Sequence, residues 1–186
     1  MTKRVYAIKK CALIGLLAAT ITGGKLALMA IANVEIVTLL IMLYAVVFGL
    51  AIALPATLIF VTTEVLLFGA GTWVISYYFY WPFLAIAFAL YSKLTKDNTI
   101  LRIVFVIVIT TFFGVFTTLV DTIFFLKAPP STFLRSFAIM YSRGVSFFIV
   151  HIVGNTLFSI VAFGTIKTHL QNLKKAYFGD INPQIR

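Results

Sequence analysis

Acidic residues are scarce in this chain: five of its 186 residues are Asp or Glu, against 15 Lys and Arg. Its one cysteine, Cys11, provides neither a disulfide framework nor a multi-cysteine metal site. The sequence has no nucleotide-binding loop, no metal-site spacing of His, Cys, Asp and Glu, and no credible Ser-His-Asp or Cys-His set. These absences exclude ATP hydrolysis by the chain itself. We therefore expect no enzyme, no cofactor and no metal.

Apolar residues, by contrast, dominate the chain. They make up 62% of it, 11% of the residues are charged, and the mean hydropathy is +1.09, which is typical of a protein surrounded by lipid. A bilayer core of about 30 Å takes about 20 apolar residues per helix, which leaves room for six or seven crossings with short loops. We expect an all-α integral membrane protein, with one transmembrane domain over residues 1–186.

Basic residues lie in three clusters at the start, middle and end of the chain. Cytoplasmic loops keep Lys and Arg, so both termini and the central loop are predicted to be cytoplasmic. This requires an even number of crossings, and we expect six. The net charge of +10 is then explained by orientation and anionic lipid, and not by nucleic acid. The clusters comprise Lys3, Arg4, Lys9 and Lys10; Lys93, Lys96 and Arg102; and Lys167, Lys174, Lys175 and Arg186.

Turn-forming residues divide the apolar sequence into these crossings. Asn33 marks an outer turn, and Pro55 suits the first turn of the third helix. Aromatic residues around 73–81 are typical of a lipid–water boundary, from which the fourth helix descends to Tyr91. The other expected helices span 11–31, 34–54, 55–69, 100–125 and about 132–167, with a basic inner loop at 92–98, an outer loop at 127–130 and a short polar tail at 168–186.

Small residues recur at every fourth position of the first helix, which places them along one side of it. Such a face lets another helix backbone approach closely, the main route to tight helix packing in lipid. The partner is either another helix of this protein or a different subunit. The residues are Ala7, Cys11, Gly15, Ala19 and Gly23, and we expect docking through Gly15, Ala19 and Gly23.

Three carboxylates lie in or near the expected spans. A carboxylate in hydrocarbon costs a few kcal/mol, so it usually faces a cavity or a partner charge. Glu35 follows the outer turn, where it is either a ligand-binding group or a solvated helix cap. Glu64 lies deeper, and we expect it to bind a ligand or to form an ion pair. Asp121 lies near the outer end of the fifth helix.

Polar and aromatic residues also recur every fourth position in the last helix. Residues four apart share a helix face, so this row is predicted to form one inward-facing wall. A single histidine is more often structural than a ligand, but a whole row of polar groups favours contact with a substrate. The row consists of Arg143, Phe147, His151, Asn155 and Ser159.

Two runs of residues in the first half of the chain, and two short motifs after them, point to a family. The runs are Gly24-Lys25-Leu26-Ala27-Leu28 and Asn33-Val34-Glu35-Ile36-Val37-Thr38-Leu39-Leu40; the motifs are Gly69-x-Gly71-x-Trp73 and Tyr80-Trp81-Pro82, preceded by Glu64. With six expected helices and the small-residue face, they resemble the substrate-binding (S) components of energy-coupling factor (ECF) vitamin transporters. The resemblance covers most of the chain.

This resemblance implies a substrate-capture subunit in the bacterial cytoplasmic membrane. Such a subunit takes a vitamin or precursor from outside, through the outer halves of helices four to six and the outer loops. It pairs with a membrane coupling subunit (the T component) and two ATPase subunits. Family members dock through Ala-x-x-x-Ala on the first helix; here the matching positions are Gly15 and Ala19, which keeps the residues small.

Within the family, the chain looks most like the components for hydroxymethylpyrimidine or pyridoxine. A flat ring could stack on an aromatic side chain while a carboxylate accepts its protons. A cobalamin-type component is the alternative inside the family. Outside it, a proton-coupled secondary transporter could use Glu64 and His151 as a relay. The expected substrate-binding residues are Glu35, Glu64, Trp73, Tyr77, Asp121, Arg143, His151 and Asn155.

Overall fold

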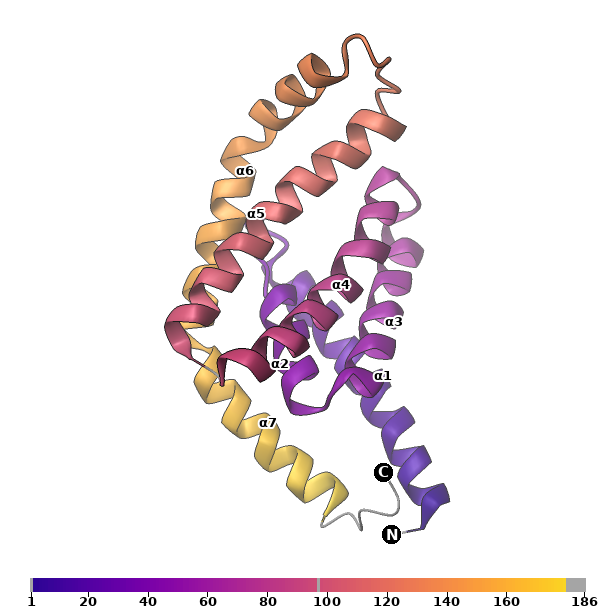
Figure 1. Cartoon of the computed structure of the whole chain (residues 1–186). Helices are drawn as coiled ribbons and strands as arrows, with labels where there is room; N and C mark the ends of the chain where they lie inside the picture. The colour runs from indigo at the N-terminus through magenta and orange to yellow at the C-terminus, as the bar shows by residue number, and fades with distance from the viewer. Residues whose placement is uncertain (1, 97, 180–186) are drawn as a thin grey trace.

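A computed structural model describes residues 2–96 and 98–179 of the chain, and this part is helical apart from its connections (Figure 1). The long helices pack side by side, and α5 and α6 form an extended antiparallel pair. The helices are α1 (Lys3–Leu28), α2 (Val37–Val47), α3 (Leu50–Phe68), α4 (Thr72–Thr95), α5 (Thr99–Phe124), α6 (Phe133–Val161) and α7 (Phe163–Phe178).

Five of these helices are long and apolar enough to cross a membrane: α1, α3, α4, α5 and α6. Many of their large apolar side chains are exposed, such as Leu66 at 81% and Leu134 at 80%. Lipid is the solvent that such a surface requires. The protein is therefore a multi-pass, all-helical membrane protein. Six crossings and cytoplasmic termini stay predictions.

The sixth apolar segment, α2, is short and lies at the centre of the fold. Nine of its 11 residues are buried, and it packs against α1, α3, α4, α6 and α7. At a rise of 1.5 Å per residue it is about 16 Å long, which is too short to cross a bilayer alone. The expected crossing over 34–54 is thus replaced by a buried half-length helix followed by the start of α3.

The boundary between α2 and α3 falls at Gly49 and not at Pro55. Gly49 has a φ of +84°, a conformation that glycine adopts without steric cost, and this ends the helical run. Pro55 lies inside α3, beyond its first turn. The boundary predicted at Pro55 is therefore six residues too late. A glycine with positive φ interrupts a helix more completely than a proline in the helix's second turn does.

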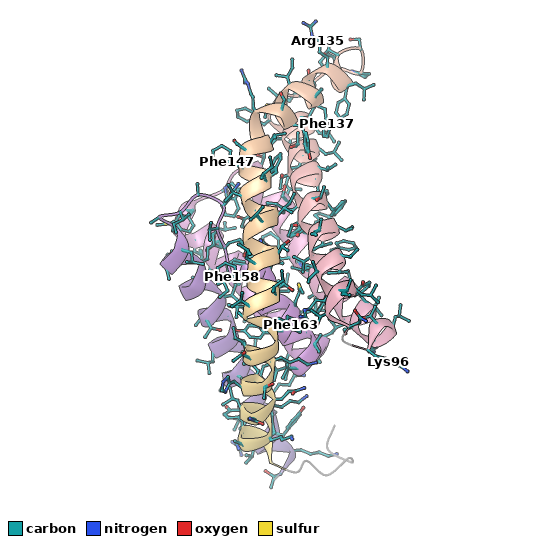
Figure 2. The ribbon with its side chains drawn as sticks, turned by 90° about the vertical axis from the view of Figure 1, so that its left-hand side faces the viewer. Lys96, Arg135, Phe137, Phe147, Phe158 and Phe163 are labelled. Atoms are coloured by element: carbon teal, nitrogen blue, oxygen red, sulfur yellow. The ribbon has the colours of Figure 1, made fainter. Side chains whose placement is uncertain are left out.

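The expected last helix is likewise divided. It ends at Val161, and a second helix, α7, begins at Phe163 after Ala162. Residues 163–178 form this second helix, so much of the expected polar tail is helical; residues 180–186 lie outside the described part. Figure 2 shows α6 and α7 following one another along one side of the molecule, with Phe163 near their junction.

Arg102, which the sequence analysis grouped with the central basic loop, is buried in α5 with 7% exposure. Its Nε donates to Ser159 Oγ at 3.3 Å, and its guanidinium lies 4.3 Å from the centre of the Phe163 ring. A cation over an aromatic face is attracted to it, more strongly when water is excluded. Arg102 therefore braces the junction of α6 and α7 against α5.

The beginning of α1 and the end of α7 meet at one end of the molecule. Lys9 Nζ donates to the Tyr177 carbonyl at 2.6 Å, and the Tyr177 hydroxyl donates to the Lys9 carbonyl at 3.2 Å. Lys93, Lys96 and Lys167 line a shared hollow between α4 and α7. Members of the first two basic clusters thus lie beside α7, which carries Lys167, Lys174 and Lys175 of the third.

Candidate ligand-binding site

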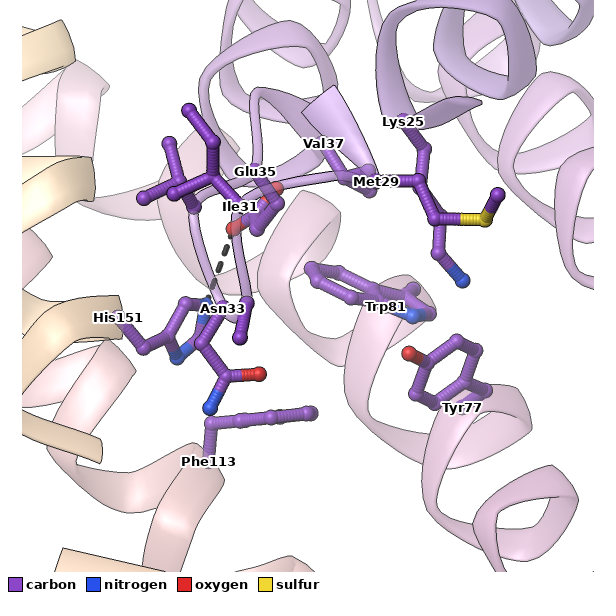
Figure 3. A pocket seen from close by; sticks show the side chains of 12 residues that line it. Lys25, Met29, Ile31, Asn33, Glu35, Val37, Tyr77, Trp81, Phe113 and His151 are labelled. Atoms are coloured by element: carbon purple, nitrogen blue, oxygen red, sulfur yellow. Dashed lines mark hydrogen bonds and ion pairs between the residues drawn. The ribbon is translucent and has the colours of Figure 1, made fainter. Parts of the chain in front are cut away.

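A cavity of about 160 Å³ lies between the connection 29–36 and the helices α1, α4, α5 and α6 (Figure 3). This volume is below the roughly 300–1,000 Å³ of pockets for drug-sized ligands, so it limits any ligand to a small molecule. The apolar part of the lining comes mainly from the connection 29–36. The polar and aromatic lining residues are Lys25, Asn33, Glu35, Tyr77, Trp81, Phe113 and His151.

One wall of the cavity is a continuous series of aromatic rings. The rings of Tyr77 and Trp81 meet edge to face with centroids 5.6 Å apart, and Trp81 lies 5.8 Å from Phe113. Phe113 in turn meets the imidazole of His151 at 4.9 Å. Edge-to-face pairs hold each other's orientation, so this wall is preformed for a flat ligand.

Glu35 ties the connection 29–36 to the rest of the fold. Its Oε2 accepts the backbone N–H of Thr38 at 2.9 Å, and its Oε1 accepts the Thr38 hydroxyl at 2.6 Å. The same Oε1 lies 3.0 Å from His151 Nε2 and accepts from Asn155 Nδ2 at 2.8 Å. One carboxylate thus caps α2 and joins it to α6.

These hydrogen bonds set the charge state of Glu35. Burial on its own would raise the pKa of the carboxyl, but the bonds from His151 and Thr38 act in the other direction and leave the pKa below its ordinary value of 4.5. Glu35 is therefore ionised at neutral pH. Because it accepts from His151 Nε2, that nitrogen carries the proton.

Glu64 is neutralised by a single cation. It has 0% exposure and forms an ion pair with the Lys25 ammonium, which belongs to α1. The ammonium also lies 5.0 Å from the ring centre of Tyr77 and 5.5 Å from that of Phe68. Lys25 lines the cavity whereas Glu64 lies behind it, so the pair presents its positive end to a ligand.

Two buried polar atoms in the cavity wall have no hydrogen-bond partner among the described residues: Trp81 Nε1 and His151 Nδ1. Both side chains have 3% exposure. An unsatisfied buried polar group costs about 1 to 3 kcal/mol, and such groups are normally matched by water or a ligand. Both nitrogens have almost no accessible surface, so neither faces the open cavity, and each gains a partner only if the side chains that cover it shift.

The structure brings several of the predicted site residues together and leaves others apart. Glu35, Tyr77 and His151 line the cavity, Asn155 supports Glu35, and Glu64 supports Lys25. The remaining three lie away from the lining: Trp73 packs edge to face on Tyr77 at 5.1 Å, Asp121 accepts a hydrogen bond from Thr72, and Arg143 is exposed on α6.

Sequence reasoning missed Lys25, Trp81 and Phe113 as lining residues. Lys25 did carry a signal, because it is a lone cation between apolar residues of α1. Trp81 lies one residue before Pro82 in the aromatic run, where the choice among six aromatic residues could not be made from spacing. Phe113 is one of 19 phenylalanines, and nothing local distinguishes it.

The small-residue face of α1 lies at the surface. Gly15, Ala19 and Gly23 are exposed, and a Cβ added at Gly15 or Gly23 would meet nothing within 4 Å. The buried face of α1 is formed instead by Leu13, Leu17, Ala18 and Ile21. Of the two partners considered, packing against this protein's own helices is therefore not how these glycines are used in the described fold.

No protein-family model, curated protein or solved structure matches this chain. The class of protein, a multi-pass helical membrane protein, follows from its helices and its apolar surface. Within the described residues there is no group of three His, Cys, Asp or Glu side chains that could hold a metal ion. What the site can do chemically is to enclose a small flat molecule and hydrogen-bond to it.

Proposed function

We propose that this protein is the substrate-capture subunit of an ATP-driven importer of the ECF type, binding a small ring-containing vitamin or precursor. The observation that carries the proposal is the cavity: about 160 Å³, walled by aromatic rings, with the Lys25 side chain in its lining. Pyridoxine and hydroxymethylpyrimidine are single rings of suitable size. A corrin is far larger than the cavity, which favours these two over a cobalamin-type ligand.

The direct test is mass spectrometry of the small molecule retained by the purified protein, followed by calorimetric titration of that molecule. Phe113→Leu shortens the aromatic wall and should weaken binding at least tenfold. Phe79→Leu is the matched control, because Phe79 lies on α4 with 67% exposure and does not line the cavity. Equal affinity of both variants and the wild type would remove the proposal.

Import also requires partners, and we assign their docking to the exposed face of α1. Gly15→Leu or Ala19→Leu should prevent a coupling-subunit helix from approaching, while binding stays intact because both positions lie outside the cavity lining. The measurement is co-purification of the membrane coupling subunit and its two ATPases with each variant. Normal assembly with both bulky variants would contradict docking through this face.

A proton-coupled secondary transporter is the second candidate, and two pairs of ionisable side chains beside the cavity favour it. Glu35 with His151, and Glu64 with Lys25, are titratable pairs beside the cavity. Glu64 contacts Lys25, and His151 contacts Glu35, so Glu64 and His151 are not paired with each other. A proton relay between them would therefore pass through both pairs. Uptake by the protein alone in liposomes, driven by a pH gradient, would favour this candidate; uptake that requires the ATPases favours the first.

A further inference from the structure

The hydrogen-bonding groups of the cavity are unevenly distributed, and one corner holds donors. Figure 3 shows the indole nitrogen of Trp81, the ammonium of Lys25 and the hydroxyl of Tyr77 on the same side of the cavity. The ammonium lies 5.0 Å from the Tyr77 ring centre, and the rings of Tyr77 and Trp81 are 5.6 Å apart. The three groups therefore surround one position.

Each of these groups can donate to a ligand atom at that position. The indole N–H of Trp81 is a donor with no acceptor function; it is buried without a partner among the described residues, and it reaches a ligand when the ligand displaces the side chains that cover it. The ammonium of Lys25 has three N–H groups, and its ion pair with Glu64 uses one oxygen of that carboxylate. The phenolic hydroxyl of Tyr77 both donates and accepts. A ligand ammonium placed here would face the Lys25 ammonium and the indole N–H, with the Tyr77 oxygen as its acceptor.

The carboxylates do not offset this preference. Glu35 is occupied by hydrogen bonds from Thr38, His151 and Asn155, and Glu64 lies behind Lys25. A ligand at the donor corner thus meets N–H and O–H groups first. Charge-assisted hydrogen bonds to an anionic oxygen are about twice as strong as neutral ones, so an anionic oxygen is the best match.

We propose that the ligand is a planar ring bearing an oxygen acceptor, a carboxylate or a deprotonated ring hydroxyl, which binds between Lys25, Trp81 and Tyr77. This inference rests on the proposed function and narrows its substrate class. It separates the two expected ligand types: a hydroxypyridine carries such an oxygen on its ring, whereas an aminopyrimidine presents an amine. The flat face of the ring packs against the aromatic wall.

The test uses three probes with one ring and one substituent position: pyridine-3-carboxylate, pyridine-3-methanol and 3-(aminomethyl)pyridine. Calorimetry on the purified full-length protein measures their relative affinities. We expect the carboxylate to bind at least about tenfold more tightly than the amine, with the alcohol between them. Equal or tighter binding of the amine would overturn the inference.

Conservative variants identify the groups responsible. Trp81→Phe and Tyr77→Phe each keep a ring and remove one donor, so each should lower the carboxylate-to-amine affinity ratio by about three- to tenfold. Phe113→Leu should weaken all three probes alike and leave the ratio unchanged. A ratio that stays the same in both donor variants would show that the corner does not select the ligand, and would overturn the inference.

The outcomes separate this inference from the proposed function. If the protein retains a native ring compound but shows no preference among the probes, the inferred selection of an oxygen acceptor is wrong and the proposed capture function is unaffected. A protein that retains no small molecule and binds each probe more weakly than about 10 mM overturns both. The double variant Lys25→Met/Glu64→Met removes the cation without leaving a lone buried carboxylate, and it should abolish the remaining preference for the carboxylate.

Discussion

The two carboxylates beside the cavity are neutralised in different ways. Glu64 depends on one cation, Lys25, and its Oε1 is buried without a partner among the described residues. Glu35 instead accepts hydrogen bonds from three residues on two helices: Thr38, His151 and Asn155. Loss of Lys25 alone would leave Glu64 without a cation. Loss of one partner of Glu35 would leave its other two hydrogen-bonding partners in place.

This difference assigns a separate role to each end of the cavity. The pair of Lys25 and Glu64 joins α1 to α3 and fixes a positive charge in the wall. The contacts of Glu35 hold the connection 29–36 against α6, and they are the interactions that must break if this connection moves. Substitutions at the two ends should therefore differ in size and in what they disturb.

The largest effect is expected from Lys25→Met, because it leaves the Glu64 carboxylate buried without its cation. Breaking one partner of a buried ion pair costs about 3 to 5 kcal/mol. Thermal unfolding of the purified protein measures the loss. Lys25→Met/Glu64→Met is the matched control and should recover most of the stability, since apolar replacement of a whole pair is often neutral. Equal loss in the single and double variants would contradict the pairing.

Glu35→Gln should have a smaller effect, about 1 to 3 kcal/mol, because the amide oxygen still accepts from His151 and Asn155 while the backbone N–H of Thr38 faces an NH2 group and loses its acceptor. The change should appear locally, as faster hydrogen exchange of the backbone in 29–36 with little change in α3. Faster exchange throughout the protein would mean that Glu35 supports the whole fold and not one connection.

The contribution of Glu35 should also depend on pH. Its folded-state pKa lies below 4.5, so its stabilising contribution is present above pH 4.5 and is lost as the pH falls through the folded value. The difference in unfolding temperature between wild type and Glu35→Gln should shrink as the pH falls below about 4.5. A difference that stays the same between pH 4.5 and 3 would contradict an ionised Glu35.

The smallest effect is expected at Phe147, which shares the four-residue spacing of His151 but is 51% exposed. Phe147→Ala should change the affinity for pyridine-3-carboxylate by less than a factor of about two, as exposed substitutions usually do. His151→Ala should weaken it at least tenfold, because it removes a ring from the wall and a partner from Glu35. Similar effects at both positions would place the ligand further out along α6.

The sequence predicts much of the helical architecture, because the length of an apolar segment can be read from consecutive residues without knowing their distant contacts. The segment 100–125 agrees with α5 within one residue at each end. The row on α6 is predicted in its inner part: His151, Asn155 and Ser159 are the residues of α6 that are buried. Arg143 continues the spacing but is exposed; it lies in the N-terminal half of α6, which runs beside α5 (Figure 1).

What could not be predicted depends on contacts between distant segments. Lys25 and Glu64 are 39 residues apart, and the spacing of neither reveals the other as its partner. The division of the second apolar segment was missed for a different reason. Gly49 and Pro55 are both helix-breaking residues, and the choice between them depends on how tightly α2 is enclosed by five other helices.

The burial of α2 has a consequence for how the protein is made. A segment of 11 residues is too short to be recognised as a membrane span by its hydrophobicity, so α2 should enter the bilayer together with α3. One of the helices that cover it, α7, is the last helix of the described chain to be synthesised. Until α7 docks and Lys174 reaches the carbonyl of Val47, the centre of the fold stays open on that side. Docking of α7, and not insertion of the earlier spans, is then the step that encloses α2 during biogenesis.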